Sequence, residues 1–586
     1  MSEKIPNPKE IEKEISEFLA KRFGNSVKIV SPIIMPESAG SEKVQIPSAG
    51  QVEINFDLKP EELVSYLDRY IVKQDSAKAV LATKICTHFN RIKFIKSCPD
   101  DIKDITGNIK NNVLVIGPTG VGKTYLIKLI AKKIGVPFVK GDATKFSETG
   151  YVGGDVEDLV RDLYREADNN IELAQYGIIY IDEIDKIASS RNHIGADISR
   201  TGVQRALLKP LEETDVDLKV MHDPISMIQE IERYRKTGKH NKKSISTKNI
   251  LFVMSGAFTE LAEIISKRIS KQSIGFGGSI TKPEKKIGIF KHVRSEDLIK
   301  FGFESEFVGR LPVRAIFESL TEDDLFDILK NPNNPIIIGK KLDFAAYGID
   351  IKFEDNTLRI FAQQAFEENT GARGLVNAVE TALLPFEKRL PSTSVKRFPV
   401  TLSVINDPEG SLEKLIKPEN NKIWDKVFEK MRVEENQFIK NYVRLNKKDL
   451  SEKYSLNLTE SRIDIVAAFY CKHIMDIDKV VKHIKSYYDE VKNVELYFFK
   501  KHDINIVLED DAIDFVIEHI VNSSIKFEDF YKQLTKNFEY GLKLIQQKTG
   551  KNRFFISKKA LLSPESFLNN LIKAELHLKR KDSFQK

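Results

Sequence analysis

Residues 117–124 are Gly117-Pro118-Thr119-Gly120-Val121-Gly122-Lys123-Thr124, which matches the pattern G-x-x-x-x-G-K-[ST]. An apolar run, Asn112–Ile116, precedes this loop, and a helical pattern, Tyr125–Ile134, follows it. Glycines let successive backbone N–H groups converge on phosphate oxygens, and the positive end of the following helix adds to the attraction. We expect Lys123 to reach the β- and γ-phosphates of a nucleotide and the Thr124 hydroxyl to bind Mg²⁺. The alternative, a purely structural glycine turn, is disfavoured by the order of strand, loop and helix.

A second apolar run, Gly177–Ile181, ends in the adjacent carboxylates Asp182 and Glu183. Ligands of doubly wound sheets bind at the carboxyl ends of the strands. We expect Asp182 to hold Mg²⁺ through water and Glu183 to polarise the attacking water. Because neighbouring side chains on a strand point to opposite faces, one strand end can serve both roles. This pattern is weak alone and becomes specific when it follows the phosphate loop.

Outward from these two motifs, short aliphatic strands alternate with helical stretches over residues 61–320, which predicts an α/β domain with a doubly wound parallel sheet. Residues 321–416 are mainly helical, apart from a strand at Ile349–Phe353, and predict a smaller domain. Residues 417–586 form a mainly helical extension rich in Lys, Phe and Tyr. Within residues 1–60 we expect one helix, Pro8–Phe23, followed by a linker.

Composition narrows the class of protein. The chain has 586 residues, a net charge of +7 and 41% hydrophobic residues, which excludes a mostly disordered protein and gives no argument for a nucleic-acid partner. No apolar run approaches the roughly 18 residues of a membrane span, and the first residues lack the apolar core of a signal peptide. The three cysteines, Cys86, Cys98 and Cys471, form no CxxC pair. A disulfide scaffold and a four-cysteine zinc site are therefore excluded, and we expect a cytoplasmic protein.

With both motifs in place, the chain resembles the AAA+ ATPases of the Clp unfoldase group, and most closely the ClpX family, from about Pro60 to Leu415. The segment Leu67–Gln74 resembles the family's adenine pocket. The resemblance implies that Tyr70, Ile71 and Val72 surround the base. The family usually has glycine where this chain has Lys73, so the backbone turn there is expected to differ.

Three further positions match the family's catalytic machinery. Ser255 resembles the sensor-1 residue. Arg310, in Glu306–Pro312, matches the arginine finger that reaches the γ-phosphate held by a neighbouring subunit. Arg373, in Gly371–Gly374, matches sensor-2. Either arginine alone is more typical of a surface salt bridge. Their order and surroundings favour the catalytic roles.

Three loops resemble segments that handle protein. Tyr151 and Val152, within Gly150–Gly153, match the pore loop that grips a translocating polypeptide. Lys239 and His240 lie in a basic segment that matches the pore entrance, although a solvated charged loop explains that segment equally well. The residues Ile274, Gly275 and Phe276 match the loop that docks on the ClpP peptidase; large apolar residues in a polar, glycine-rich segment usually indicate a partner.

The resemblance therefore implies an ATP- and Mg²⁺-dependent homohexameric protein unfoldase and translocase. Its partners would be unfolded or tagged protein substrates, adaptors and a ClpP-like peptidase, with no nucleic acid and no membrane. The sister family HslU is disfavoured because the short stretch 161–176 leaves no room for its inserted domain. A nucleic-acid motor is disfavoured because the pore segment lacks base-stacking aromatic residues. A chaperone that docks no peptidase remains the alternative.

Two departures from the family stand out. The chain lacks the cysteines for the family's zinc module, so no zinc is predicted and residues 1–60 have no assigned role. The extension contains a short internal similarity, Ile349–Asp355 with Ile504–Asp510. Independent use of a strand before an acidic helix start and a degenerate copy of the small domain both explain it. Because no arginine motif follows Asp510, we do not expect that segment to contact nucleotide.

Overall fold

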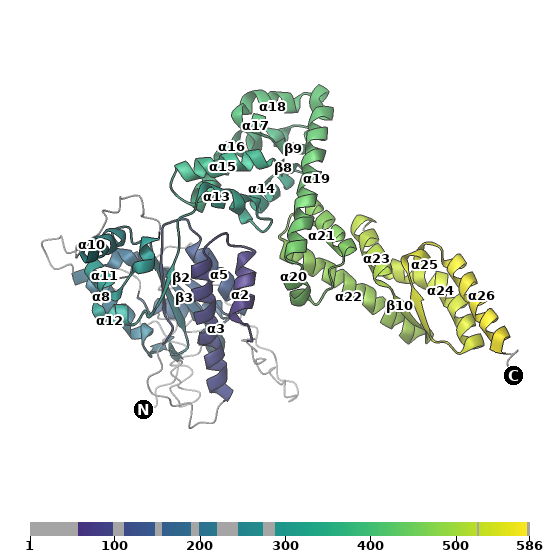
Figure 1. Ribbon diagram of the computed structural model, residues 1–586, viewed down its shortest axis with the longest axis horizontal. Helices are drawn as coiled ribbons and strands as arrows, with labels where there is room; N and C mark the ends of the chain where they lie inside the picture. The colour runs from purple at the N-terminus through teal and green to yellow at the C-terminus, as the bar shows by residue number, and fades with distance from the viewer. Residues whose placement is uncertain are drawn as a thin grey trace, which may run out of the picture. The chain divides into compact units, whose positions relative to one another are not determined.

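The computed structural model describes residues 57–97, 110–146, 155–188, 198–218, 244–273, 288–523 and 527–582, all of which belong to one compact unit, Ile54–Lys586. The helix expected at residues 8–23 and the linker after it lie outside these ranges. No helix in the described ranges is long and apolar enough to cross a membrane. Figure 1 shows the chain and labels many of the elements of this unit.

A five-stranded sheet forms the centre of the first part of the unit, as expected for the doubly wound class. The strand order is β2-β3-β6-β1-β7, and every neighbouring pair is parallel. Strands β1, β3 and β6 are buried along almost their whole length, which explains their continuous aliphatic sequences. The bounds are β1 Val113–Ile116, β2 Phe138–Asp142, β3 Ile178–Asp182, β6 Leu251–Gly256 and β7 Val313–Ile316.

Alternate residues of the sheet enter two separate cores. Val113, Tyr180 and Val253 pack with helices α2, α3 and α5, whereas Ile116 and Ile181 pack with α6, α8 and α10. The sheet is therefore covered on both faces. The bounds are α2 Pro60–Asp68, α3 Asp75–Ser97, α5 Lys123–Ile134, α6 Asp158–Glu166, α7 Ile171–Ala174, α8 Ile198–Leu211, α10 Leu261–Ser273, α11 Ser295–Phe301 and α12 Ser305–Gly309.

Two features of this part were not predicted. An antiparallel pair, β4 Asp215–Asp217 with β5 Ser244–Ser246, flanks the sheet region. Strand β7 begins at Val313, directly after the segment Glu306–Pro312 that contains Arg310. Both are too short to give a clear alternating pattern.

The eight α-helices and strands from α13 to α18 form what we call the first repeat; a short 3-10 helix, Leu390–Ser392, also lies between α16 and β9. Two helices precede a short strand, and two more helices lead to a second strand that pairs in parallel with the first. Two further helices complete the repeat. Its buried residues are continuous with the core that contains α2, α3 and α5. The elements are α13 Glu322–Lys330, α14 Pro335–Ala345, β8 Asp350–Phe353, α15 Asp355–Glu367, α16 Ala372–Arg389, β9 Arg397–Val400, α17 Leu402–Asn406 and α18 Pro408–Ile416.

The same order of elements returns in the extension, and we call this copy the second repeat. Two helices, α19 Asn421–Leu445 and α20 Lys447–Tyr454, connect the repeats. The second repeat has a core of its own. Its elements are α21 Glu460–Lys472, α22 Ile477–His502, β10 Asn505–Leu508, α23 Asp510–Ser523, α24 Phe527–Thr549, β11 Arg553–Ile556, α25 Lys558–Leu562 and α26 Pro564–Asp582.

Hydrogen bonds that flank the two strand pairs match in detail. In the first repeat, Glu354 N donates to Val400 O at 3.0 Å; in the second, Glu509 N donates to Ile556 O at 3.0 Å. Each bond lies where a strand gives way to an acidic helix start. The internal similarity seen in the sequence therefore extends to eight elements in one order.

Candidate nucleotide site

The phosphate loop connects the carboxyl end of β1 to the first turn of α5. Gly120 and Gly122 have φ angles of 73° and 89°, in the left-handed region that favours glycine. Lys123 Nζ donates to the carbonyl oxygens of Gly117 and Pro118, at 2.7 and 2.8 Å. Burial lowers the pKa of Lys123 to about 8, against the opposing effect of Asp182 and Asp185. The loop, its helix and its lysine thus have the form that a nucleotide phosphate group requires.

A chain of hydroxyl groups joins the loop to the end of β3. Thr124 Oγ1 donates to Tyr180 OH at 3.0 Å, Tyr180 OH donates to Ser255 Oγ at 2.6 Å, and Ser255 Oγ donates to Asp182 Oδ1 at 2.6 Å. The two residues expected to hold Mg²⁺, Thr124 and Asp182, are therefore linked through Ser255 and Tyr180. A hydroxyl and a carboxylate are hard oxygen ligands, the kind that Mg²⁺ takes together with substrate phosphates.

Asp182 is held in its charged form. Burial alone would raise its pKa, but hydrogen bonds from Ser255 and from Lys140, whose Nζ lies 3.0 Å from Asp182 Oδ2, lower it below the usual range. The sequence analysis assigned no role to Tyr180 or Lys140. A tyrosine inside a fully buried apolar strand was the available signal, because a buried hydroxyl needs a partner.

Glu183 does not continue the strand. Strand β3 ends at Asp182, and Glu183 is exposed with a φ of 58°, while its N–H donates to Asp182 Oδ1 at 3.1 Å. The prediction that Asp182 and Glu183 point to opposite faces of one strand is therefore wrong, because Glu183 does not belong to the strand. Glu183 lies in the turn that follows β3.

The first repeat contacts the phosphate loop directly. Ala372 N donates to Gly120 O at 2.8 Å, and a Cβ added at Gly120 would lie 2.0 Å from Thr370 O. Arg373, in the first turn of α16, is exposed, and its charge lowers the pKa of Lys123. The structure thus brings Arg373 to the phosphate loop together with Lys123.

The segment expected at the adenine base begins beside this loop. Ile71 is buried, and its Cδ1 lies 4.0 Å from where a Cβ of Gly122 would stand. Tyr70 donates its hydroxyl hydrogen bond to Asp478, a residue of the second repeat that the sequence analysis did not single out. Val72 is partly buried.

Lys73 keeps the backbone conformation that glycine would favour. Its φ is 60°, and that of Gln74 is 64°. Lys73 Nζ donates to Asp324 at 2.7 Å and to Ser319 O at 2.9 Å, while Gln74 exchanges two hydrogen bonds with the backbone of Glu318. These bonds offset the cost of two left-handed residues.

Arg310 lies at the end of α12. It forms an ion pair with Glu212, and its carbonyl oxygen accepts a hydrogen bond of 3.2 Å from Asn112. In the part of the chain that the structure describes, its polar contacts do not include the residues around Lys123. The pore residues Tyr151 and Val152, the entrance residues Lys239 and His240, and the docking residues Ile274, Gly275 and Phe276 lie outside the described residues.

Comparison with known proteins agrees with this site. The family model of the AAA domain (Cdc48 subfamily) matches residues 108–314, which include both motifs. The "ATP-dependent Clp protease ATP-binding subunit ClpX" of Treponema denticola is 39% identical over 337 residues, covering 57% of this chain and 77% of that protein. The protein of the same name from Borrelia duttonii is 40% identical over 351 residues, covering 59% of this chain and 78% of that protein. The chain is thus about 40% identical to these relatives over more than three quarters of their length. The phosphate loop, the end of β3 and the start of α16 agree with that similarity. The chain is therefore an AAA+ ATPase of the ClpX family.

Proposed function

We propose that this ATPase is a homohexameric protein unfoldase and translocase that threads protein substrates into a ClpP-like peptidase. The observation that supports the proposal is the grouping around the phosphate loop, where the charges of Asp182 and Arg373 both act on Lys123 and Ala372 N donates to Gly120 O. The relatives are named as ATP-binding subunits of the Clp protease, which supports the choice of partner. The proposed domains are residues 61–320 for nucleotide hydrolysis, 321–416 as the small domain and 417–586 as the extension.

Each residue of the site has a distinct task in this proposal. The backbone N–H groups of residues 119–124 and the Lys123 side chain would hold the phosphates, and Thr124 and Asp182 would hold Mg²⁺. Bound Mg²⁺ and ATP supply the transferable phosphoryl group and neutralise its charge. Glu183 polarises the attacking water, for which its exposed position outside the strand leaves room. Arg373 contributes positive charge from the same subunit.

Arg310 acts in the proposal on nucleotide held by the adjacent subunit. Its side chain is 46% exposed, so its ion pair with Glu212 contributes little stability and can be exchanged for another anion. An arginine supplied in trans accelerates phosphoryl transfer by several powers of ten. Hydrolysis would then require assembly.

The test of the proposal is degradation of a tagged, folded reporter by the purified protein with ATP and the ClpP of the same organism. Glu183→Gln should retain nucleotide binding and lose hydrolysis and degradation, whereas Glu166→Gln, on the exposed face of α6, should retain both. ATP turnover within a few-fold of wild type in Glu183→Gln would contradict the catalytic assignment.

Phe276→Ala separates the two forms of the proposal. If ClpP is the partner, this variant should still hydrolyse ATP and unfold the reporter but should not co-sediment with ClpP. A central aromatic anchor is commonly worth about 2 kcal/mol or more, and six loops on one ring would multiply the loss. If wild type and variant behave alike and neither degrades the reporter, a chaperone without a peptidase is the better assignment.

A further inference from the structure

The second repeat contacts the nucleotide segment through a buried carboxylate at the start of α22. Asp478 accepts hydrogen bonds from four donors: Arg69 Nη1 at 3.0 Å, Lys453 Nζ at 2.7 Å, Tyr454 OH at 3.0 Å and the Tyr70 hydroxyl. Arg69 and Tyr70 directly precede Ile71. Asp478 is therefore the residue through which the extension reaches the proposed adenine pocket.

Two cations, Arg69 and Lys453, favour the ionised form of Asp478. Burial would raise its pKa, but Arg69 and Lys453 lower it below the usual range. The side chain of Arg69 is 4% exposed, so removal of Asp478 would leave a buried cation without its counter-ion. Such a carboxylate fixes the groups around it more firmly than a surface ion pair does.

A second set of bonds ties the same segment to the first repeat. The carbonyl oxygen of Arg69 accepts hydrogen bonds from Asn331 Nδ2 at 3.0 Å and Asn333 Nδ2 at 3.1 Å, both in the loop between α13 and α14. Asn333 also accepts a bond of 3.0 Å from Ile477 N, at the start of α22. The nucleotide segment, the first repeat and the second repeat therefore meet at Arg69 and Asn333.

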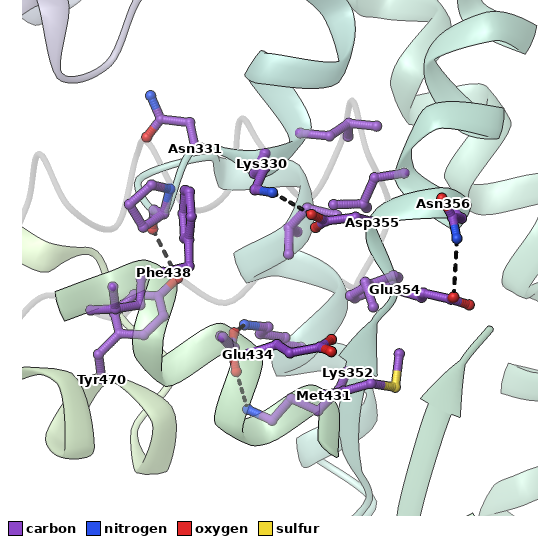
Figure 2. A pocket seen from close by; sticks show the side chains of 18 of the residues that line it. Lys330, Asn331, Lys352, Glu354, Asp355, Asn356, Met431, Glu434, Phe438 and Tyr470 are labelled. Carbon is purple, nitrogen blue, oxygen red and sulfur yellow. Dashed lines mark hydrogen bonds and ion pairs between the residues drawn. The ribbon is translucent and has the colours of Figure 1, made fainter. Parts of the chain in front are cut away.

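The connecting helix α19 fastens the extension to the first repeat at another point. Glu435 pairs with Lys341 and with Lys352, whose Nζ lies 2.7 Å from Glu435 Oε2. A pocket of about 440 Å³ lies beside this pair. Figure 2 shows that Lys352, Met431, Phe438 and Tyr470 line it, from β8, α19 and α21. With α19 held in this way, the approach of Asp478 to Tyr70 does not depend on a single contact.

From these contacts we infer that the second repeat braces the nucleotide site of its own subunit, and that Asp478 positions Tyr70 and thereby sets the affinity for adenine nucleotide. The inference rests on the proposed function only in that Tyr70, Ile71 and Val72 are taken to contact the base. Asp478 touches Tyr70 and not the reacting atoms, so it is a positioning residue.

Kinetics distinguish this role from a catalytic one. Contacts to the base are the same before and during phosphoryl transfer, so their loss raises KM and leaves kcat unchanged. We expect Asp478→Asn to raise the KM for ATP roughly tenfold, the scale of one hydrogen bond to a charged group, with kcat within about twofold of wild type. Tyr70→Phe, which removes only the hydroxyl, should raise KM by a smaller factor. The double variant should be no worse than Asp478→Asn alone, because both changes break one connection.

Asp514→Asn is the matched control. Asp514 is also a buried carboxylate of the second repeat, 5% exposed and paired with Arg462 at 2.7 Å. Among the described residues it also accepts a hydrogen bond from Thr459, the residue that caps α21. It should lower the melting temperature of the protein without changing KM. Equal increases in KM for Asp514→Asn and Asp478→Asn would reduce the effect to general destabilisation and overturn the inference.

Equilibrium binding of a fluorescent ADP analogue separates failure of this inference from failure of the site. Lys123→Ala should abolish binding; if it binds as wild type does, the proposed nucleotide site itself is wrong. If Lys123→Ala loses binding while Tyr70→Phe and Asp478→Asn both keep wild-type affinity, only the brace is wrong. The inference would also be overturned if Tyr70→Phe and Asp478→Asn lowered the affinity independently, so that the double variant showed the product of the two effects. Should Asp478→Asn fail to fold, Tyr70→Phe alone decides.

Discussion

The first and second repeats share one order of helices and strands, yet they meet the nucleotide site through different residues. The first repeat approaches the phosphate loop with the turn before α16, where Ala372 bonds to Gly120. The second repeat approaches the segment at Tyr70 with the start of α22. A fold of this size therefore offers several surfaces, and the residues on each surface decide what it contacts.

Electrostatics between equivalent helices also differ. In the first repeat, Arg359, one turn into α15, pairs with Asp323 of α13 at 3.4 Å, and both side chains are more than half exposed. In the second repeat the signs are reversed. Asp514, one turn into α23, pairs with Arg462 of α21, and both are buried. The same two helices are joined by a weak exposed pair in one repeat and by a strong buried one in the other.

The largest predicted effect exploits that reversal. Arg462→Met should destabilise the second repeat by about 3–5 kcal/mol, because it leaves the buried Asp514 without its counter-ion. Arg359→Met should cost less than about 1 kcal/mol. Urea denaturation followed by hydrogen exchange of peptides from each repeat measures both. Equal losses would mean that burial does not separate the two pairs.

A second prediction concerns the helices α16 and α24, which occupy the same place in the two repeats. Arg373→Ala should lower kcat/KM for ATP roughly a hundredfold, the scale of one electrostatic donor at a developing charge. Glu528→Ala, in the first turn of α24, should leave ATP turnover unchanged. A comparable loss in Glu528→Ala would show that the second repeat also reaches the phosphates.

The third prediction concerns pH, which should weaken the contact of the second repeat through Asp478 and leave the contact of the first repeat through Ala372 unchanged. The pKa of Asp478 is below its ordinary value near 4, so its contribution to stability is complete above that value and is lost as the pH falls through the folded pKa. Among the described residues, the charged and titratable groups around it include Arg69, Lys133, Lys453, Tyr66, Tyr70, Tyr442 and Tyr454. The lowered pKa therefore predicts that the contact between Asp478 and the nucleotide segment weakens at acid pH.

Between pH 5 and pH 3, the melting temperature of wild type should fall more steeply than that of Asp478→Asn. Expressed as unfolding free energy, the slopes of the two proteins against pH should differ by at most about 1.4 kcal/mol per pH unit, the limit for one carboxyl group. Parallel slopes in the two proteins would exclude Asp478 as the group responsible. The backbone bond between Ala372 and Gly120 contains no titratable atom, so the first repeat's contact should persist through this range.

The smallest prediction compares two helix caps. Thr321 accepts a hydrogen bond from Asp324 N at 3.2 Å at the start of α13, and Thr459 accepts one from Arg462 N at 3.3 Å at the start of α21. Replacing either by alanine should cost about 1 kcal/mol of unfolding free energy in its own repeat. Melting curves of the two variants, followed by the same exchange measurement, would show whether the caps are as equivalent as their positions.

How far the sequence predicted this molecule follows from the range of the interactions involved. The phosphate loop and the carboxylate at the end of β3 depend on neighbouring residues, and the structure places both at the expected edge. Tyr180 and Ser255 meet only because β3 pairs with β6 in a definite register, and a pattern of strands does not give their order. Glu183 was misjudged because a turn, which the apolar run does not encode, follows Asp182.

The extension was the hardest part to predict. Its contact with Tyr70 joins residues 408 positions apart, and a single polar residue at a helix start carries no sign of such a partner. The repeat itself was only partly recognised. A further signal was present, since Arg397-Phe398 in β9 corresponds to Arg553-Phe554 in β11.

The two left-handed glycines of the phosphate loop differ in how much variation each can tolerate. Gly122 has only the side chain of Ile71 nearby, at 4.0 Å, so a substitution there would strain the backbone of one residue. At Gly120 an added methyl group would collide with the carbonyl of Thr370 and act as a wedge under the first repeat. A side chain at position 120 would therefore be constrained both by the backbone of the phosphate loop and by the first repeat, and a substitution that satisfies one constraint still meets the other.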